Sequence, residues 1–525
     1  MENVSRGSLL LLFPPNWSAC VSGPHLALPL IAGASRNAGI EVQSWDLSWE
    51  FYRRYGTPPS STELISACLE KDFNSLDKYY FRWEDSICNQ ADMNNIQFGL
   101  LSGFSEKNFQ SISLKALVQG LRNDSIYCQF YDTYLRERVI ELNPKMIGVT
   151  ISSQNQIAST IALLIKLRTW LPNVKLVLGG NVVTRLYNLA PEDYDLLKSL
   201  VDHIINYQGE IAISDIFTST KMDKIQGHEK IDTSLWPIPI FDGLPIGRYP
   251  GYNSIPFVST RGCYWGKCSF CAIPEGWSKS GYAGSLPHNS IMQHVNNMVE
   301  STGVSNIKFV DEAFPPSKVF GLYDLIKYNH PFLWEAYARL ESSWEEEERI
   351  VAAYLSGCRK LYFGLEMAPS ENRKYLGKND KGNILKIMRL CKEVGINVHL
   401  FCMVGHPKTT KQDADRTVRF LIEHAELIDT ADLVGFRLDK GTMVGGVMPI
   451  RDDTPSYYLS NKFQPTENGI MNYDEVIRLE NSCQEKLWDA VPRLLHPLYR
   501  IGMPWNKNIP QTSILHAQSE NVINV

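Results

Sequence analysis

The chain has 525 residues, enough for two to four domains, and its 44% hydrophobic content is ordinary for a globular protein. A net charge of −5 gives no electrostatic reason to expect a nucleic-acid partner. No apolar run approaches the ~20 residues of a membrane helix, and most of the eleven cysteines stand singly, without a disulfide framework. We therefore expect a cytoplasmic, soluble protein with no nucleic-acid or membrane partner.

The first two hundred residues have the pattern of a parallel α/β domain. Strands are predicted over residues 8–13, 40–45, 146–151, 174–178 and 201–206, and helices over 25–38, 157–171 and from 209 onward. A strand–helix–strand start favours a parallel sheet. The segment from about 60 to 138 is rich in aromatic and polar residues, and we expect a helical insertion there.

Two loops of this domain carry small and amide residues at the carboxyl ends of strands, where open parallel sheets bind ligands. The candidates are Ser152, Ser153, Gln154, Gly179, Gly180 and Asn181. Glycines let the backbone approach a bulky, flat ligand closely. On these residues alone, an ordinary flavodoxin-like domain with glycines at helix and strand ends explains the pattern equally well.

Prolines and glycines over residues 226–253 predict an extended linker. From 254 to about 440, strands and helices then alternate. The expected strands are 254–260, 306–310, 333–338, 360–363, 398–403 and 433–437, and the expected helices are 288–301, 317–328, 344–355, 381–394 and 410–426. Six such units predict a partial barrel.

Three cysteines follow the first barrel strand, with four and then two residues between them: Cys263, Cys268 and Cys271. Cysteine thiolates are the usual ligands of iron–sulfur clusters, and barrel enzymes place their chemistry at the carboxyl ends of strands. Three ligands on a four-iron cluster leave one iron open to a small molecule. A zinc site, which normally wants a fourth ligand at similar spacing, and chance cysteines are the alternatives.

The cysteine loop, with Phe270 just before the last cysteine, resembles the cluster loop of the radical S-adenosylmethionine (SAM) superfamily. The first gap is four residues here, where three is the commonest spacing. The serine loop, the double glycine and the linker phrase Phe241-Asp242-Gly243-Leu244-Pro245 resemble the cobalamin-dependent members. Together these features cover most of residues 1–440.

This resemblance implies the following architecture. Residues 1–225 would form a Rossmann-like, flavodoxin-type α/β domain that binds cobalamin. Residues 254–440 would form a partial (β/α)6 TIM-like radical SAM barrel. A small, mostly helical region, 441–525, would follow, with a helix from Tyr473 to about Leu487 and a disordered end. Tyr499, Met503 and Trp505 are candidates to cover the barrel mouth, and a plain packing helix with a loose end is the alternative.

The resemblance also implies a set of ligand contacts. Cys263, Cys268 and Cys271 would hold a 4Fe–4S cluster. The residues that would contact SAM are Phe270, Asp311, Glu312, Arg339, Glu366, Val404 and His406. The serine and glycine loops would contact cobalamin. Ion pairs at the barrel rim are the alternative explanation for the charged residues among the SAM candidates.

One feature departs from many cobalamin proteins: the cobalt-ligating motif Asp-x-His-x-x-Gly is absent from the chain. His25 lies near the loop after the first strand, but its neighbours do not match the motif. We expect His25 to start a helix, and we expect bound cobalamin to be base-off, with no histidine on cobalt.

The implied activity is that of an enzyme. The cluster would reduce SAM to a 5′-deoxyadenosyl radical with electrons from an external flavodoxin- or ferredoxin-type reductant, and cobalamin would carry the methyl group. We expect a C-methyltransferase acting on an unactivated carbon of a small natural-product intermediate or a peptide. The alternatives are a non-methylating oxidation, rearrangement or ring contraction with the same cofactors, and a cobalamin- or cluster-based sensor without turnover.

Overall fold

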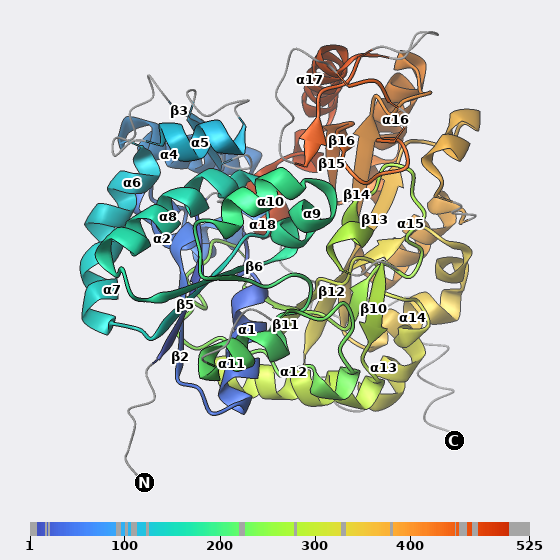
Figure 1. The fold of residues 1–525 in the computed structure, drawn as a ribbon. Coiled ribbons are helices and arrows are strands. Elements are labelled where there is room, and N and C mark those ends of the chain that lie inside the picture. Colours follow the sequence, from blue (N-terminus) through green and yellow to red (C-terminus); the bar gives the residue numbers. More distant parts are fainter. Residues whose placement is uncertain are drawn as a thin grey trace.

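The computed structural model contains two parallel β-sheets with their helices, which lie side by side in Figure 1. It describes residues 8–502 apart from 16–17, 19–20, 91–95, 100–102, 107–112, 122–124, 220–225, 252, 278–280, 327–331, 379–381, 447, 451–458 and 465–470. The predicted α/β fold class is confirmed, including a flavodoxin-type sheet followed by an open barrel.

The amino-terminal sheet has the strand order β2-β1-β5-β6-β7, and every pairing in it is parallel. Its strands are β1 (Leu9–Phe13), β2 (Val42–Asp46), β5 (Met146–Thr150), β6 (Lys175–Gly179) and β7 (His203–Ile204). This is the flavodoxin-like order, with its switch point between β1 and β5. β1 is buried at all five positions, as expected for a parallel strand with both faces covered.

The two faces of β1 belong to different cores. Leu10 and Leu12 pack into a core with α8 (Ile157–Trp170) and the segment between β2 and β5. Leu9, Leu11 and Phe13 belong to a second core that includes α1 (Ala27–Asn37), α11 (Glu210–Thr218) and the layer between the second sheet and its helices. The two sheets are therefore joined by one continuous apolar core.

The segment between β2 and β5 is mostly helical, as expected. Its elements are α2 (Leu47–Tyr55), α3 (Ser61–Glu70), α4 (Phe73–Gln90), β3 (Ile96–Gly99), β4 (Gly103–Glu106), α5 (Leu114–Gly120), α6 (Ile126–Phe130), a π-helical turn at Tyr131–Leu135 and α7 (Arg136–Leu142). The antiparallel β3–β4 hairpin was not predicted. The helical run from α6 to α7 packs on α8, so it belongs to the domain core rather than to an insertion.

The strand predicted over 201–206 is reduced to the two residues of β7. Before it, the Asp202 N–H still donates to the Leu176 carbonyl at 3.0 Å, while the Asp202 carboxylate accepts the Leu176 N–H at 2.7 Å and pairs with Arg168 at 2.7 Å. Two further helices, α9 (Asn181–Leu189) and α10 (Pro191–Lys198), lie between β6 and β7.

The second sheet is six-stranded and parallel, in the order β15-β14-β13-β12-β11-β8. Its strands are β8 (Ile255–Phe257), β11 (Asn306–Phe309), β12 (Leu333–Arg339), β13 (Cys358–Glu366), β14 (Asn397–Val404) and β15 (Thr430–Gly435). The helices are α12 (His288–Thr302), α13 (Lys318–Ile326), α14 (Glu347–Leu355), α15 (Ile384–Val394) and α16 (Lys411–Glu423). The edge strands β8 and β15 are not paired with each other, so the barrel is open, as predicted.

The first barrel strand ends earlier than predicted. After β8 the chain forms a second short strand, β9 (Thr260–Gly262), which pairs antiparallel with β10 (Tyr282–Ser285). The cysteine loop is thus the connection of a hairpin that stands at the end of the barrel.

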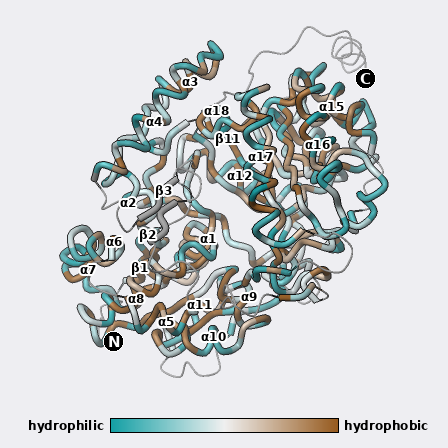
Figure 2. The backbone as a smooth tube through the Cα atoms, turned by 90° about the horizontal axis from the view of Figure 1, so that it is seen from above, coloured by the Kyte–Doolittle hydropathy of each residue, from teal (hydrophilic) through white to brown (hydrophobic). Residues whose placement is uncertain are grey.

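The last helices join the two halves (Figure 1). α17 (Tyr473–Ala490) packs on α16 and β15, and α18 (Pro497–Gly502) packs on α3 and α4 of the amino-terminal half. Figure 2 shows α18 at the boundary between the halves. Tyr499 packs against Phe73, at a ring distance of 5.3 Å, so it lies against the amino-terminal half and not over the barrel mouth. Met503, Trp505 and the last ten residues lie outside the described residues.

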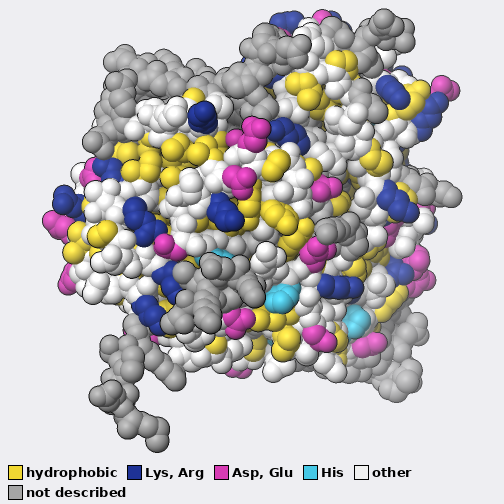
Figure 3. Space-filling model, viewed as in Figure 1, with side chains coloured by type: hydrophobic (Ala, Val, Ile, Leu, Met, Phe, Trp, Pro, Cys, Tyr) yellow, Lys and Arg dark blue, Asp and Glu magenta, His cyan; other side chains and the backbone are white. Residues whose placement is uncertain are grey.

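Acidic and basic side chains are interspersed over the face that Figure 3 shows, with no extended region of one sign. Among the described residues, none of the helices combines the length and the apolar character needed to cross a bilayer.

Candidate active site

A cavity of about 440 Å³ lies between the two sheets. Its walls come from the carboxyl ends of β1, β5 and β6 and the start of α1 on one side, and from the ends of β8 and β11 and the segment 273–277 on the other. Most lining side chains are apolar, and they include Leu26, Ile31, Val177, Ile205, Val258 and Val310. An apolar cleft with a few convergent polar groups, at the switch point of a parallel sheet, is where α/β proteins bind ligands.

The double glycine lets the backbone form the floor of this cavity. Gly180 has a φ of +112°, and a Cβ there would collide with the Ile151 carbonyl oxygen. Ser152, Gly179 and Asn181 line the cavity as well. The Asn181 side chain reaches the opposite wall, where it lies so close to Gly276 that no side chain would fit at that position.

The remaining candidates of the serine loop lie elsewhere. Ser153 caps a short 3-10 turn, Gln154–Gln156, with its hydroxyl accepting the Asn155 N–H. The Gln154 amide faces the carboxy-terminal region, where it donates to Ser460 Oγ and accepts the Leu459 N–H, both at 3.1 Å. Neither side chain lines the cavity in this structure.

His25 starts α1, as expected. Its Nδ1 accepts the Ala27 N–H at 3.2 Å, and its ring stacks on Phe13 at 4.8 Å. Burial lowers the pKa of His25 to about 4, so the ring is neutral at pH 7. The side chain also lines the cavity.

A buried ion pair crosses from the cysteine hairpin to the amino-terminal sheet. Arg261 of β9, 1% exposed, pairs with Glu210 at the start of α11 at 2.5 Å and donates to Gln208 Oε1. Its guanidinium lies 4.2 Å from the ring centre of Trp236 in the linker. Arg261 Nε and Glu210 Oε2 are buried without a hydrogen-bond partner among the described residues. Because buried polar groups are normally satisfied, a water molecule or a polar group of a ligand would be expected beside these atoms at the cavity wall.

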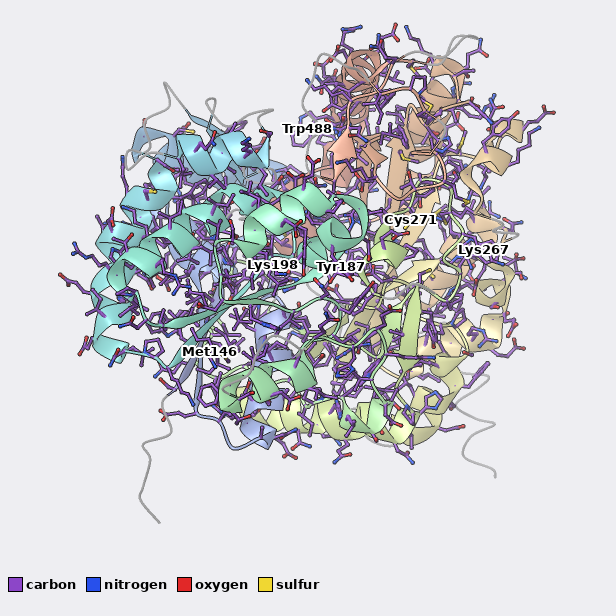
Figure 4. All side chains as sticks on the ribbon, viewed as in Figure 1. Met146, Tyr187, Lys198, Lys267, Cys271 and Trp488 are labelled. Atoms are coloured by element: carbon purple, nitrogen blue, oxygen red, sulfur yellow. The ribbon has the colours of Figure 1, made fainter. Side chains whose placement is uncertain are left out.

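The cysteine loop is held by backbone contacts and leaves its thiols partly exposed. Cys263 N–H donates to the Gly281 carbonyl at 3.2 Å, and Ser269 N–H donates to the Leu376 carbonyl at 2.9 Å. Gly262 and Gly266 have φ values of +82° and +61°, conformations that only glycine adopts without strain. The three thiols are half-buried and form no disulfide. Figure 4 places Cys271 on the barrel side of the boundary between the halves, facing the helix that carries Tyr187.

Three cysteine thiols on one loop are a donor set that an iron–sulfur cluster uses. Among the described residues, no three or more His, Cys, Asp or Glu side chains are already gathered around one point as metal ligands. Burial raises the pKa of Cys268 to about 11 and that of Cys271 to about 12, so these thiols need a metal to become thiolates at pH 7. The cationic groups of Lys378 and Arg339 favour the thiolate of Cys268.

The two acidic residues after β11 face different surroundings. Asp311 is fully buried and accepts from Ser259 N–H, Ser259 Oγ and Thr260 N–H at 2.5–2.9 Å. It braces the turn into the cysteine hairpin, away from the cavity. Glu312 lines the cavity and accepts the Trp277 Nε1–H at 2.8 Å. Burial raises the pKa of Glu312 to about 6, so this carboxylate is mostly ionised at pH 7.

The other candidates for SAM contacts surround the cysteine loop. Phe270 meets the His406 ring edge to face at 6.2 Å, and His406 Nε2 lies 3.2 Å from Ser269 Oγ. Val404 is buried at the end of β14. Arg339 lies over the Trp265 ring at 4.4 Å and pairs with Glu341 at 3.1 Å.

Glu366, the last of these candidates, pairs with Lys378 at 2.8 Å. Its φ of +62° is uncommon for a residue other than glycine, and such strain gathers at functional sites.

Several residues of the site were not predicted from the sequence. Arg261, Glu210 and Gln208 form the polar contact between the halves, and Trp236 and Trp277 support Arg261 and Glu312. The sequence did give an indication for Arg261, because this arginine stands two residues before the first cysteine and follows an otherwise apolar strand. Its partner could not be inferred, because Glu210 lies in another domain.

Residues 257–421 match the family model of the radical SAM superfamily. The barrel is therefore a radical SAM domain, and the predicted enzyme class is confirmed. An uncharacterized methyltransferase of Pyrococcus horikoshii is 21% identical over 358 residues, which span 61% of this chain and 73% of that protein.

Two solved structures share the fold across both halves. The radical SAM methyltransferase TsrM from Kitasatospora setae, with tryptophan substrate and a SAM analogue bound, has a TM-score of 0.57 and 13% identity, over 98% of this chain and 96% of that one. TsrM with cobalamin and a 4Fe–4S cluster bound has a TM-score of 0.50 and 14% identity, over 84% and 77%. The resemblance drawn from the sequence is thus confirmed for the radical SAM domain and for the two-sheet fold.

The Arg261–Glu210 pair predicts a large effect on stability. In Glu210→Gln the guanidinium of Arg261 stays buried without a counter-charge, which we expect to cost about 3–5 kcal/mol in the free energy of unfolding. The matched control is Asp242→Asn, which breaks the exposed pair of Arg36 and Asp242, at 2.6 Å, and costs at most about 1 kcal/mol. Urea unfolding of both variants measures the difference, and equal losses would contradict the role given to Arg261.

Proposed function

We propose that this radical SAM enzyme is a cobalamin-dependent C-methyltransferase. One observation carries the proposal: the cavity between the halves has a flavodoxin-type switch point as one wall and the strand ends beside the cysteine loop as the other. A ligand in this cavity contacts both cofactor-binding elements at once. TsrM, which shares the fold, is a methyltransferase whose structures hold cobalamin, a 4Fe–4S cluster and tryptophan.

The residues present suit the proposed ligands. Gly179 and Gly180 give a flat, side-chain-free floor for a corrin, and the partnerless atoms of Arg261 and Glu210 suit its polar substituents. Cys263, Cys268 and Cys271 would hold the cluster, and Glu312 would accept hydrogen bonds from the ammonium of SAM. When bound, the cluster supplies an electron that cleaves SAM, and cobalamin supplies a methyl carrier.

The protein's own contribution is to position these groups and to exclude water. The apolar lining keeps the cavity dry, which strengthens the interaction of Glu312 with a cation. Ser269 and His406 hold the cysteine loop against β14, where Phe270 and Val404 offer apolar contacts to an adenine. An external one-electron reductant of flavodoxin or ferredoxin type and a small-molecule or peptide substrate complete the proposal.

We also propose that cobalamin binds without a histidine on cobalt. Nδ1 of His25 is engaged by the Ala27 N–H, and the ring is stacked on Phe13. Cobalt that lacks an axial histidine nitrogen is easier to reduce. The reduced cobalt is the form that can accept a methyl group from SAM. The non-methylating alternatives share these cofactors and would differ in the products formed from SAM.

The three cysteines give the first test. After anaerobic reconstitution we expect about four iron atoms per wild-type chain, and almost no iron or SAM cleavage in a triple variant with Cys263, Cys268 and Cys271 changed to Ala. Cys88→Ala is the control, because Cys88 is a half-buried thiol outside this loop. A full iron complement in the triple variant would sink the cluster assignment.

Gly180→Ala tests the cobalamin site. The new Cβ collides with the Ile151 carbonyl oxygen and the φ of +112° becomes strained, so the floor must shift. We expect hydroxocobalamin affinity, followed by absorbance titration, to fall about tenfold or more, which is about 1.4 kcal/mol or more of binding free energy. Gly120→Ala is the control, because a Cβ added at Gly120 meets no other atom within 4 Å. Unchanged affinity in Gly180→Ala would favour an ordinary flavodoxin-like domain.

A further inference from the structure

The cysteine loop has an inner and an outer face. Figure 4 shows Cys271 toward the boundary between the halves and Lys267 on the side of the loop away from Tyr187. The inner face adjoins the cavity proposed for cobalamin, because the segment 273–277 forms part of that cavity's wall. The proposed function needs an electron from outside the chain, and the outer face is the side left for the electron donor.

The segment 371–378, which follows β13, extends this outer face. The Tyr375 carbonyl accepts the Ser269 hydroxyl at 2.8 Å, and the Gly377 carbonyl accepts the Trp265 Nε1–H at 3.2 Å. These hydrogen bonds fix the segment directly against the cysteine loop, so the two form one continuous surface.

The segment 405–412, which follows β14, borders the same surface. His406 Nε2 lies 3.2 Å from Ser269 Oγ, and Lys408 Nζ lies 5.3 Å from the ring centre of Tyr375. We call the surface that these segments share the basic face; it consists of residues 263–271, 371–378 and 405–412.

The basic face carries an excess of positive charge. Its three segments contain six lysines and arginines and one glutamate, whereas the whole chain has a net charge of −5. Lys267, Lys374 and Lys408 are exposed, and among the described residues none of the three has an ion pair. Lys378, by contrast, is buried and pairs with Glu366. Three exposed cations therefore surround the outer side of the cysteine loop without a carboxylate partner.

A tyrosine stands among these cations. The Tyr375 side chain is 37% exposed, and Nζ of Lys374 and Nζ of Lys408 each lie 5.3 Å from its ring centre. The φ of Lys408 is +70°, a conformation that strains a residue other than glycine. An exposed aromatic ring with charged neighbours is typical of a protein interface, where the ring supplies packing and the charges select and steer the partner.

We propose that the basic face is the docking surface of a small acidic protein of flavodoxin type. Its carboxylates would meet Lys267, Lys374 and Lys408, and the exposed edge of its flavin would pack on the Tyr375 ring, since a flat aromatic group stacks well on another. The anionic flavin hydroquinone loses one electron and becomes the neutral semiquinone, and the cluster in the cysteine loop gains that electron, so no proton has to move. The proposal rests on the proposed function, because only a reducible cluster needs such a donor.

The test measures binding of reduced flavodoxin to the reconstituted enzyme by isothermal titration calorimetry. In the triple variant Lys267→Glu, Lys374→Glu, Lys408→Glu, we expect the Kd at low ionic strength to rise about tenfold or more, because attraction becomes repulsion. Added salt should weaken binding to the wild-type enzyme and close this gap, since exposed charges are screened.

The matched control is a second triple variant with the same change in net charge. It alters exposed lysines on α5, α10 and α15, and its Kd should stay within about twofold of the wild-type value; the changes are Lys115→Glu, Lys198→Glu and Lys386→Glu. Dithionite is a small reductant that needs no docking surface, so both triple variants should cleave SAM with dithionite at the wild-type rate.

Tyr375→Ala tests the aromatic contact separately. It should weaken binding of flavodoxin without changing the salt dependence, and it should leave binding of an acidic 2Fe–2S ferredoxin, which has no flavin, unchanged. Tighter binding of that ferredoxin, or of a single-stranded RNA, than of flavodoxin at the same salt concentration would overturn the choice of partner.

A wild-type Kd that does not depend on salt overturns the proposal, even if a variant fails to fold. An unchanged Kd in the first triple variant overturns it as well, and so does loss of dithionite-driven SAM cleavage in a folded variant, because the lysines would then support the loop itself. The proposed function is tested separately, since the Kd needs no SAM. Lysine-dependent flavodoxin binding in an enzyme that forms no S-adenosylhomocysteine with dithionite would support the basic face and contradict the methyltransferase.

Discussion

The ion pair of Arg261 and Glu210 is the contact on which the arrangement of the site depends. Arg261 belongs to the hairpin that carries the three cysteines, and Glu210 begins the helix that follows β7, the edge strand of the other sheet. Burying two charges is expensive and adds little net stability compared with apolar packing. What the pair supplies is geometry, because it fixes how the cysteine hairpin faces the glycine floor at Gly180.

The apolar core makes this geometry rigid. Alternate residues of β1 pack toward the barrel and away from it, so the amino-terminal sheet is one wall of a core that continues into the second sheet. α18 strengthens the junction, since it packs on α3 while Arg500 reaches Asp432 of β15. A cavity inside the barrel, lined by the opposite faces of the barrel strands, adjoins the cavity between the sheets at His25 and Val310.

The features that depend on local sequence patterns were predicted correctly. The apolar run of β1, the alternation of strands and helices and the cysteine spacing led to the correct fold class and the correct family of domains. Contacts between distant segments were not predictable. Asp311 and Glu312 are adjacent, and no periodicity tells which one turns inward after a strand has ended. The Gln154 amide, expected to face a ligand, binds Ser460 instead, some three hundred residues away.

One signal in the barrel was present and not used. Lys308, Glu335, Lys360 and His399 occupy inward positions of strands that pair in parallel on both sides. Interior strands of parallel sheets normally read as apolar runs. Charged residues alternating with apolar ones in such strands indicate a barrel with a polar interior, and hence a cavity with charged walls.

The most direct measurement of the central claim is product analysis after anaerobic incubation of the reconstituted enzyme with SAM and a reductant, with and without hydroxocobalamin. The account predicts that S-adenosylhomocysteine forms only when cobalamin is present, together with 5′-deoxyadenosine once a substrate is supplied. Formation of 5′-deoxyadenosine without S-adenosylhomocysteine under both conditions would contradict methyl transfer and favour the non-methylating chemistry.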